Sequence, residues 1–157
     1  MTLSNRQNNA VVLFRLLIGW HFFYEGITKL YNPSWTAKAY LNSSSGPFKW
    51  FFEMLSGDGI IGIIDYLNIL GLAGIGLALI LGFWDKWASI AGIILLLFYY
   101  FSQPPFPGLA QIGTEGNYFL VNKNLIEAAG LYVIYCFPTS QYFGIQKLFG
   151  SSNNQLK

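Results

Sequence analysis

The stretch GIIGIIDYLNILGLAGIGLALILGFW, residues 59–84, decides the fold class. Its only charged residue is Asp65, and most of the other residues are strongly apolar. A helix needs about 20 predominantly apolar residues to cross the hydrocarbon core of a bilayer. The stretch meets that length, so it predicts a membrane-spanning helix.

Three further apolar runs lie on either side of this stretch, at about residues 10–31, 87–102 and 118–137. The prolines at 104, 105 and 138 end the last two runs. The first run carries ionisable residues in its interior and lacks a small-residue cleavage site, so we interpret it as a permanent span and not a signal peptide. We therefore predict an all-α, four-helix transmembrane bundle formed by one domain, residues 1–157.

The composition supports a membrane protein. Hydrophobic residues make up 54% of the chain and charged residues 10%, whereas a soluble domain carries roughly 25% charged residues. This argues against a soluble enzyme and a disordered chain, and a net charge of +2 supplies no basic face for nucleic acid. The single cysteine, Cys136, excludes an internal disulfide, and the single histidine, His21, excludes an all-histidine metal cluster, so we expect no metal site.

The connections between the runs differ in kind. Residues 32–58 form a long loop with two short helical patterns, at about 33–41 and 47–55, and the second gathers its phenylalanines on one side. This predicts short interfacial helices in the first loop, with a buried cap over the bundle as the alternative. Residues 102–117 are expected to form an irregular loop. Four spans place both termini on one side, but Lys and Arg divide evenly between the two sides, so the positive-inside rule does not choose an orientation.

Several ionisable residues lie within the first span. Each one costs roughly 2.5–3.5 kcal/mol inside a bilayer, so it usually faces the bundle interior or water. At 100° per residue, one half of this helix carries all of its internal ionisable residues and two glycines: Arg15, His21, Glu25, Lys29, Gly19 and Gly26. The glycines are expected to permit close helix approach. On the second span, packing is expected through the small residues Gly74, Ala78 and Gly82.

The depth of each polar residue adds a second constraint. Six residues are expected at the membrane face on the side of the loops: Glu25, Lys29, Asp65, Lys123, Asn124 and Glu127. The second and third spans add further polar residues near the same depth: Asn68, Tyr99, Tyr100, Ser102 and Gln103. His21 and Arg15 lie progressively deeper. The sequence therefore predicts a polar vestibule that opens toward the loops and is closed toward the termini.

Structural interpretations of the same residues stay open at this point. Glu25–Lys29 and Lys123–Glu127 can form i,i+4 ion pairs at helix ends. Arg15 can form an ion pair with a carboxylate from another helix, and His21 can be a packing residue. Cys136 is expected to be an inert apolar filler.

The sequence resembles the DoxX/DoxD family of small four-helix membrane proteins from about residue 11 to 145. The features that carry the resemblance are Arg15 with Gly19, the GITK turn at 26–29, the PSW motif at 33–35 and the NLIEA start of the last run at 124–128. The resemblance implies a multi-pass protein of the prokaryotic cytoplasmic (inner) membrane with both termini in the cytoplasm. The vestibule would then open to the periplasmic or outer side.

The resemblance also implies a range of functions. The DoxD branch is the membrane subunit of a thiosulfate:quinone oxidoreductase, while other members are linked to oxidative-stress complexes or to assembly. The resemblance to the DoxD branch implies a quinone (ubiquinone or menaquinone) as co-substrate and no covalently bound cofactor. The partners expected are membrane lipid, a second oxidoreductase subunit and further copies of this chain, but not nucleic acid.

The vestibule residues can be given roles if the chain carries out that reaction. Thiosulfate, a dianion, would be held by Arg15, Lys29, Lys123 and Asn124. Protons for the quinone would pass through His21, Glu25, Asp65 and Glu127, and its ring would be flanked by Trp20, Tyr24 and Tyr66. The sequence has no haem-ligand pair, cluster-binding cysteine set or flavin motif, so electrons would pass directly or through a partner subunit. The alternatives are a non-catalytic scaffold or assembly partner, and a small-solute or lipid-binding protein that uses the same cavity.

Overall fold

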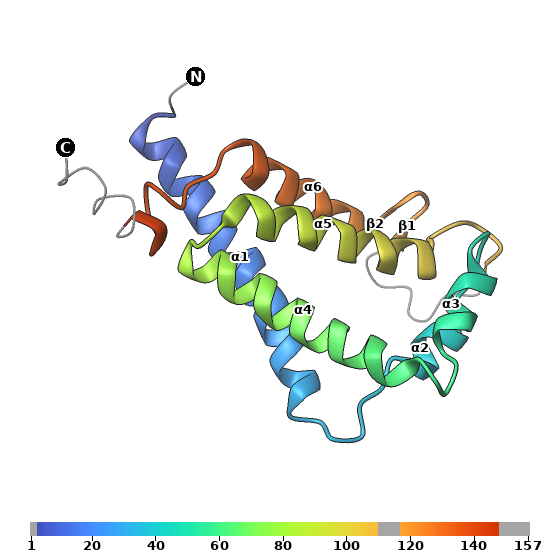
Figure 1. The fold of residues 1–157 in the computed structure, drawn as a ribbon. Coiled ribbons are helices and arrows are strands. Elements are labelled where there is room, and N and C mark those ends of the chain that lie inside the picture. Colours follow the sequence, from blue (N-terminus) through green and yellow to red (C-terminus); the bar gives the residue numbers. More distant parts are fainter. Residues whose placement is uncertain (1–2, 110–116, 148–157) are drawn as a thin grey trace.

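The computed structural model describes residues 3–109 and 117–147, and within them the chain is mostly helical (Figure 1). The elements are α1 (Asn5–Leu30), α2 (Lys38–Asn42), α3 (Lys49–Leu55), α4 (Ile61–Leu81), α5 (Asp85–Ser102), β1 (Asn117–Tyr118), β2 (Val121–Asn122) and α6 (Lys123–Cys136). The two strands form a small antiparallel hairpin directly before α6. The predicted loop 102–117 and the C-terminal tail fall partly outside the described residues.

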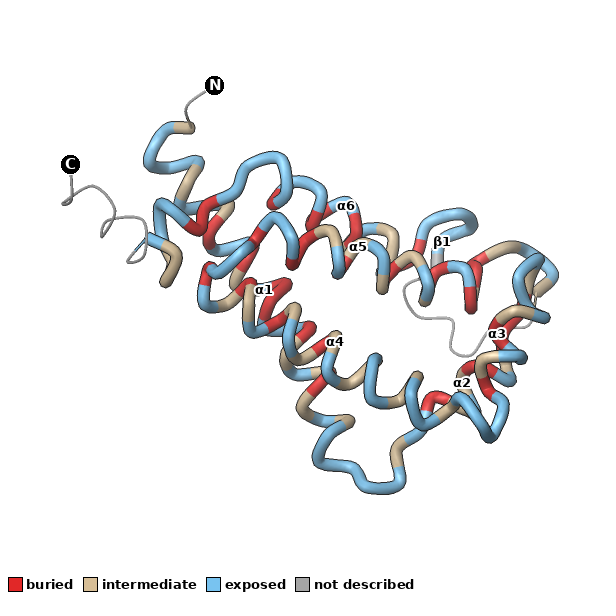
Figure 2. Tube along the Cα trace, viewed as in Figure 1, coloured by how far each residue is buried: buried red, intermediate tan, exposed pale blue. Residues whose placement is uncertain are grey.

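The four long helices form two pairs, α1 with α4 and α5 with α6. The pairs approach each other at the end where α1 begins and diverge toward the end where α2 and α3 lie (Figure 1). We call these the closed end and the open end of the molecule. Figure 2 shows that buried positions lie mainly on the faces that the helices turn toward one another.

Two helix boundaries differ from the prediction. The first helix starts at Asn5 and not at residue 10, because Ser4 and Gln7 form a capping box in which each side chain bonds the other's backbone N–H. The fourth helix starts at Lys123 and not at residue 118. There the Asn122 side chain caps the backbone N–H of Leu125 at 3.0 Å, and the preceding residues are taken up by the hairpin.

Two of the described helices, α1 and α4, are long and apolar enough to cross a membrane. Helix α5 has 18 residues and α6 has 14. At 1.5 Å per residue, α6 extends only about 21 Å, less than the roughly 30 Å of a bilayer core. A four-span topology therefore remains a prediction.

Small residues let α1 and α4 approach closely. A Cβ atom on Gly76 would lie 2.3 Å from the backbone nitrogen of Phe23, and one on Gly26 would lie 2.5 Å from that of Ala73. The predicted role of the α1 glycines is thus confirmed. The predicted stripe on α4 is right only in part: Ala78 packs against the core and a Cβ on Gly82 would lie 2.8 Å from Arg15 Nη2, but a Cβ on Gly74 would meet nothing within 4 Å. Position 74 lies about 200° around the helix from position 76, so it faces away from α1.

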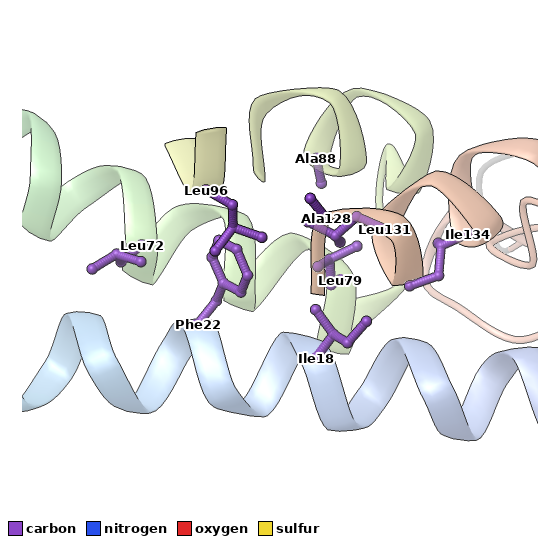
Figure 3. Close-up of a cluster of buried hydrophobic side chains, with 9 residues drawn as sticks. All are labelled: Ile18, Phe22, Leu72, Leu79, Ala88, Leu96, Ala128, Leu131 and Ile134. Atoms are coloured by element: carbon purple, nitrogen blue, oxygen red, sulfur yellow. The ribbon is translucent and has the colours of Figure 1, made fainter. Parts of the chain in front are cut away.

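The main core lies between the helix pairs (Figure 3). It contains Ile18, Phe22, Leu72, Leu79, Ala88, Leu96, Ala128, Leu131 and Ile134, so all four long helices contribute. A second cluster, built around Ala37, Leu41 and Phe52, packs α2 and α3 against the start of α4. The rings of Phe51 and Phe52 also contact Phe98 of α5, with centroids 6.5 Å apart.

Helices α2 and α3 thus connect the two diverging pairs at the open end. The predicted short helices of the first loop are present, and the buried Phe52 favours the alternative in which they cap the bundle. Trp50 and Met54 of α3 remain exposed, as expected for a helix that also touches a membrane interface. The cap matters for function because it covers one side of the cavity described next.

Candidate functional site

A cavity of about 270 Å³ lies where the helix pairs diverge. Most of its lining comes from α1, α2 with the segment that leads into it, α4, α5 and α6: His21, Glu25, Lys29, Trp35, Thr36, Ala37, Tyr40, Asn68, Tyr99, Lys123, Asn124 and Glu127. Three core residues, Phe22, Leu72 and Leu96, also line it. The cavity therefore combines an apolar floor with polar walls.

Most of the predicted vestibule residues line this cavity. The structure brings together His21, Glu25, Lys29, Lys123, Asn124 and Glu127. Asn68 and Tyr99, which the sequence places at a similar depth, join them. The predicted vestibule is thus present at the open end, whereas the chemical role of each residue stays a prediction.

A histidine–carboxylate hydrogen bond and an ion pair organise one wall of the cavity. His21 Nδ1 of α1 lies 2.6 Å from Glu127 Oε1 of α6, and Lys29 Nζ lies 2.5 Å from Glu25 Oε2 one turn away on α1. The i,i+4 interpretation is therefore right for Glu25–Lys29. It is wrong for Lys123, because Glu127 pairs with His21 across the helices.

Two residues of this wall, His21 and Lys123, can still interact with a ligand. The His21 side chain is 48% exposed, so packing against other side chains covers only part of its surface. Lys123 is exposed and has no hydrogen-bond or ion-pair partner within residues 3–109 and 117–147. The wall therefore offers an accessible imidazole and a cation whose charge is not matched by a direct partner.

Arg15 does not belong to the vestibule, contrary to the prediction that it holds substrate there. Its side chain is fully buried at the closed end and donates to Thr139 Oγ1 at 3.0 Å and to the Phe143 carbonyl at 2.6 Å. Its Nη1 lies 3.8 Å from Asp85 Oδ2. The alternative of an ion pair with a carboxylate from another helix is correct. The physical reason is that the segment after α6 folds back and supplies acceptors at the depth of Arg15.

Asp85 is the central residue of the closed end that sequence reasoning missed. Its Oδ2 accepts from the backbone N–H groups of Thr139 and Ser140, both at 2.8 Å. In the sequence it lies in the short connection between the second and third apolar runs. A signal was available, since Asp85 is the one acid of the chain that the predicted topology places on the side of the termini.

Asp65 was also predicted in the vestibule, but it does not line the cavity. Its Oδ1 accepts from the backbone N–H of Ala37 at 2.8 Å. Ala37 precedes the first residue of α2, where backbone N–H groups lack partners within the helix. Asp65 thus attaches α2 to α4 and positions the cap without facing the cavity.

The three residues predicted to flank a quinone ring point away from the cavity. Trp20, Tyr24 and Tyr66 are 60%, 56% and 71% exposed, and none of them lines it. The aromatic residues that do line it are Phe22, Trp35, Tyr40 and Tyr99. Hydropathy alone could not separate these sets, because the rotational phase of each helix is set by tertiary packing.

Trp35, Tyr40, Asn68 and Tyr99 form a second wall of the cavity, which we call the aromatic wall. Asn68 Nδ2 of α4 donates to the Tyr99 hydroxyl of α5 at 2.6 Å, and the Tyr40 hydroxyl donates to the Tyr99 carbonyl at 3.3 Å. Burial raises the pKa of Tyr40 to about 12, so its hydroxyl stays neutral at physiological pH. Lys29 Nζ lies 5.6 Å from the centre of the Trp35 ring, within the range of a cation–π contact.

In the long loop formed by residues 32–58, a further ion pair joins Lys38 to the fully exposed Asp58. Lys38, through its hydrogen bond and positive charge, lowers the pKa of the Asp58 carboxyl. This contact joins the start of α2 to the segment between α3 and α4, away from the cavity.

Comparison with known proteins gives the family. The model of the DoxX family matches residues 10–103, which include α2 to α5 and most of α1. No curated protein and no solved structure matches the chain. The family match covers more than half of the sequence and agrees with the two apolar helices. The chain is therefore a membrane protein of the DoxX family.

Proposed function

We propose that this chain is the membrane subunit of a quinone-linked oxidoreductase and that its vestibule holds the quinone ring. The observation that carries the proposal is the 2.6 Å hydrogen bond between His21 and Glu127 at the wall of a cavity with an apolar floor. The finer form is a thiosulfate:quinone oxidoreductase of the prokaryotic inner membrane. Both termini would then be cytoplasmic and the vestibule would open outward.

The lining suits a flat ring with polar substituents. Phe22, Leu72 and Leu96 provide apolar contact, and Trp35 and Tyr99 add aromatic surface. The cavity volume, about 270 Å³, is near the lower end of the roughly 300–1,000 Å³ typical of ligand pockets. A ring fits such a volume, whereas an isoprenoid tail would remain in the surrounding lipid.

The His21–Glu127 pair would supply protons to the ring. Quinone reduction to quinol consumes two electrons and two protons, and imidazole exchanges protons near neutral pH. The Glu127 carboxylate holds Nδ1, so it fixes the orientation of the imidazole ring and leaves the other nitrogen for a ligand oxygen. The exposure of the His21 side chain lets it recover a proton after each transfer.

Lys123 would attract the anionic electron donor. Two thiosulfate dianions yield one tetrathionate and two electrons when an S–S bond forms between them, and these electrons and two protons convert the quinone to quinol. Lys123 is a cation at the cavity with no direct partner in the described part of the chain, and Asn124 adds a neutral hydrogen-bonding group beside it. Electrons would reach the ring directly from the donor or through a second subunit.

The test separates ring binding from turnover. The full chain in lipid nanodiscs is titrated with decylubiquinone and with menadione by isothermal calorimetry, and thiosulfate is then added while quinone absorbance is followed. Binding of either quinone, weakened by Glu127→Gln and unaffected by Asp58→Asn in the long loop, supports the proposal. If neither quinone binds, the proposal is wrong even when a partner subunit is needed for turnover.

The proposed orientation has a separate test. Fusion of a fluorescent protein after Lys157 is expected to yield fluorescence in cells, because the fusion folds in the cytoplasm. A fusion of periplasmic alkaline phosphatase at the same position should be inactive. The reverse pattern would contradict cytoplasmic termini.

A non-catalytic scaffold is the second candidate, favoured by the buried Arg15–Asp85 contact, whose observed partners are all structural. It predicts that the vestibule charges also hold the bundle together. His21→Phe and Glu127→Gln should then lower the melting temperature as strongly as changes at Asp85. Native mass spectrometry on the same samples distinguishes a third possibility, a retained lipid or small solute.

A further inference from the structure

The vestibule contains a second polar contact that the proposed proton exchange does not use. We infer that Asn68 and Tyr99 bind a hydroxyl group of the ligand and thereby make the site selective for the quinol form. The inference rests on the proposed function, because it assumes that a ring enters the cavity. It assigns a specificity role to two residues on the aromatic wall.

The two side chains are joined across diverging helices. Asn68 of α4 donates through Nδ2 to the Tyr99 hydroxyl of α5 at 2.6 Å, and both residues line the cavity. Tyr99 is held in turn by Tyr40, whose ring packs edge-on against it with centroids 6.1 Å apart. The pair is therefore positioned by contacts from three elements.

The pair has unused hydrogen-bonding capacity. Asn68 Oδ1 is buried and accepts no hydrogen bond from the described residues. A tyrosine hydroxyl can both accept and donate. Tyr99 accepts from Asn68, and its own proton has no acceptor within residues 3–109 and 117–147. Tyr99 thus has one free donor, and Asn68 Oδ1 adds one acceptor once its side chain turns toward a molecule in the cavity.

Other buried polar atoms do not share this placement. Arg15 Nε, Ser45 Oγ and Gln103 Oε1 are also buried without a hydrogen bond in the described part of the chain. None of these three residues lines the cavity. Asn68 therefore stands out because a residue with an unsatisfied acceptor lines the cavity, so a rotation of its side chain lets a ligand satisfy that acceptor.

The chemistry of the pair matches a phenolic hydroxyl. Such a group donates its proton to Asn68 Oδ1 and accepts the proton of Tyr99, which fills both open positions. A quinone carbonyl can only accept, so it satisfies Tyr99 and leaves Asn68 Oδ1 unmatched. The site should accordingly hold the quinol more tightly than the quinone, and a methyl ether more weakly than the free hydroxyl.

The experiment compares two probes that differ by one methyl group, 4-methoxy-1-naphthol and 1,4-dimethoxynaphthalene. Their dissociation constants are measured by isothermal calorimetry on the full chain in nanodiscs, for the unsubstituted protein, Asn68→Leu and Tyr99→Phe. Tyr100→Phe is the matched control, since the neighbouring hydroxyl donates to the Leu120 carbonyl outside the cavity. Melting temperatures are recorded for all proteins.

We expect the naphthol to bind the unsubstituted protein more tightly than the diether does. Each of Asn68→Leu and Tyr99→Phe should raise its dissociation constant by about 3- to 10-fold, the range of one hydrogen bond. Tyr100→Phe should leave it unchanged, and diether binding should be nearly the same in the unsubstituted protein, Asn68→Leu and Tyr100→Phe, since the ether oxygen can only accept from Tyr99. The melting temperature of Asn68→Leu should change little, because loss of the hydrogen bond to Tyr99 is offset by removal of a buried unsatisfied acceptor.

Equal naphthol affinity in the unsubstituted protein and in both cavity variants would overturn the inference while leaving the proposed function intact. Binding of neither naphthalene probe, together with failure of decylubiquinone and menadione to bind, would overturn the proposed function and the inference with it. Should Asn68→Leu fail to fold, Tyr99→Phe decides, since it removes only the hydroxyl.

Discussion

The closed and open ends of the molecule both place charged groups of α1 against another helix, but they treat those groups differently. At the closed end, Arg15 is fully buried and one Asp85 oxygen accepts two backbone N–H groups. At the open end, the His21 side chain is half exposed and Lys123 has no direct partner in the described residues. Charge within an apolar helix therefore does not by itself mark a functional site. A candidate binding site also needs a cavity, lined by polar groups that lack some of their hydrogen-bond partners.

The largest effect is expected from breaking the closed end. Asp85→Ala leaves the Arg15 guanidinium without its counter-charge and two backbone N–H groups of the C-terminal segment without their acceptor. Loss of one partner of a buried ion pair costs about 3–5 kcal/mol of unfolding free energy. Unfolding in a detergent titration measures this loss. Asp58→Asn, at a fully exposed carboxylate, is the control, and a loss from Asp85→Ala no larger than the control's would contradict the assignment.

A somewhat smaller effect on stability is expected at the contact between α1 and α4, which runs from the closed end toward the open end. Gly76→Ala would place Cβ 2.3 Å from the Phe23 backbone nitrogen, so the helices must separate. Such overpacking costs about 1–3 kcal/mol. Gly74→Ala meets nothing within 4 Å and should raise helix stability slightly. Thermal unfolding of the two variants tests the difference, and equal melting temperatures would show that the helices do not depend on this contact.

At the open end, Glu127→Gln should lower the unfolding free energy by about 1 kcal/mol, less than Asp85→Ala, because it weakens one hydrogen bond to a histidine that is half exposed. Binding of quinone should nevertheless weaken, because His21 loses the carboxylate that orients it. Measuring both quantities on one sample sharpens the contrast with Asp85→Ala. A stability loss comparable to that of Asp85→Ala would mean that the two ends do not differ in kind.

The effect expected to be smallest at neutral pH concerns the cap over the open end, whose stability should depend on pH only under alkaline conditions. Burial raises the pKa of Tyr40 to about 12, above the ordinary value near 10, so folding favours the neutral hydroxyl. The corresponding stabilisation is fully present below about pH 10 and is lost as the pH rises through about 12. Tyr40→Phe should therefore lose less stability than the unsubstituted protein between pH 10 and 12. Parallel curves for the two proteins would contradict this.

Hydropathy and depth predicted the open end well. The four helical runs and six cavity residues, among them Glu25 and Lys123, follow from counting residues along apolar segments, because that count sets how deep each side chain lies. The predicted helix lengths were less accurate, since capping by Ser4 and Asn122 decides where α1 and α6 begin. The hairpin before α6 had no counterpart in the prediction.

Orientation and partner choice could not be predicted in the same way. Asp65 lies at the expected depth but bonds Ala37, and Trp20, Tyr24 and Tyr66 lie on faces that tertiary packing turns outward. The partners of Arg15 depend on the return of residues 139–143 to the start of the bundle, which no local pattern encodes. Elimination would have found Asp85, because a buried guanidinium requires a carboxylate at its own depth.

The contacts of Arg15 also limit the order in which parts of the protein can fold during its synthesis. Arg15 enters the membrane with the first helix, whereas Thr139 follows 124 residues later. At roughly 5–20 residues per second during synthesis, the guanidinium waits on the order of 10 s for this partner. The first helix must therefore be retained by its apolar residues and by early pairing with α4. The closed end forms only after residues 139–143 have been made, so chains truncated before residue 139 should be recognised as misfolded by cellular quality control.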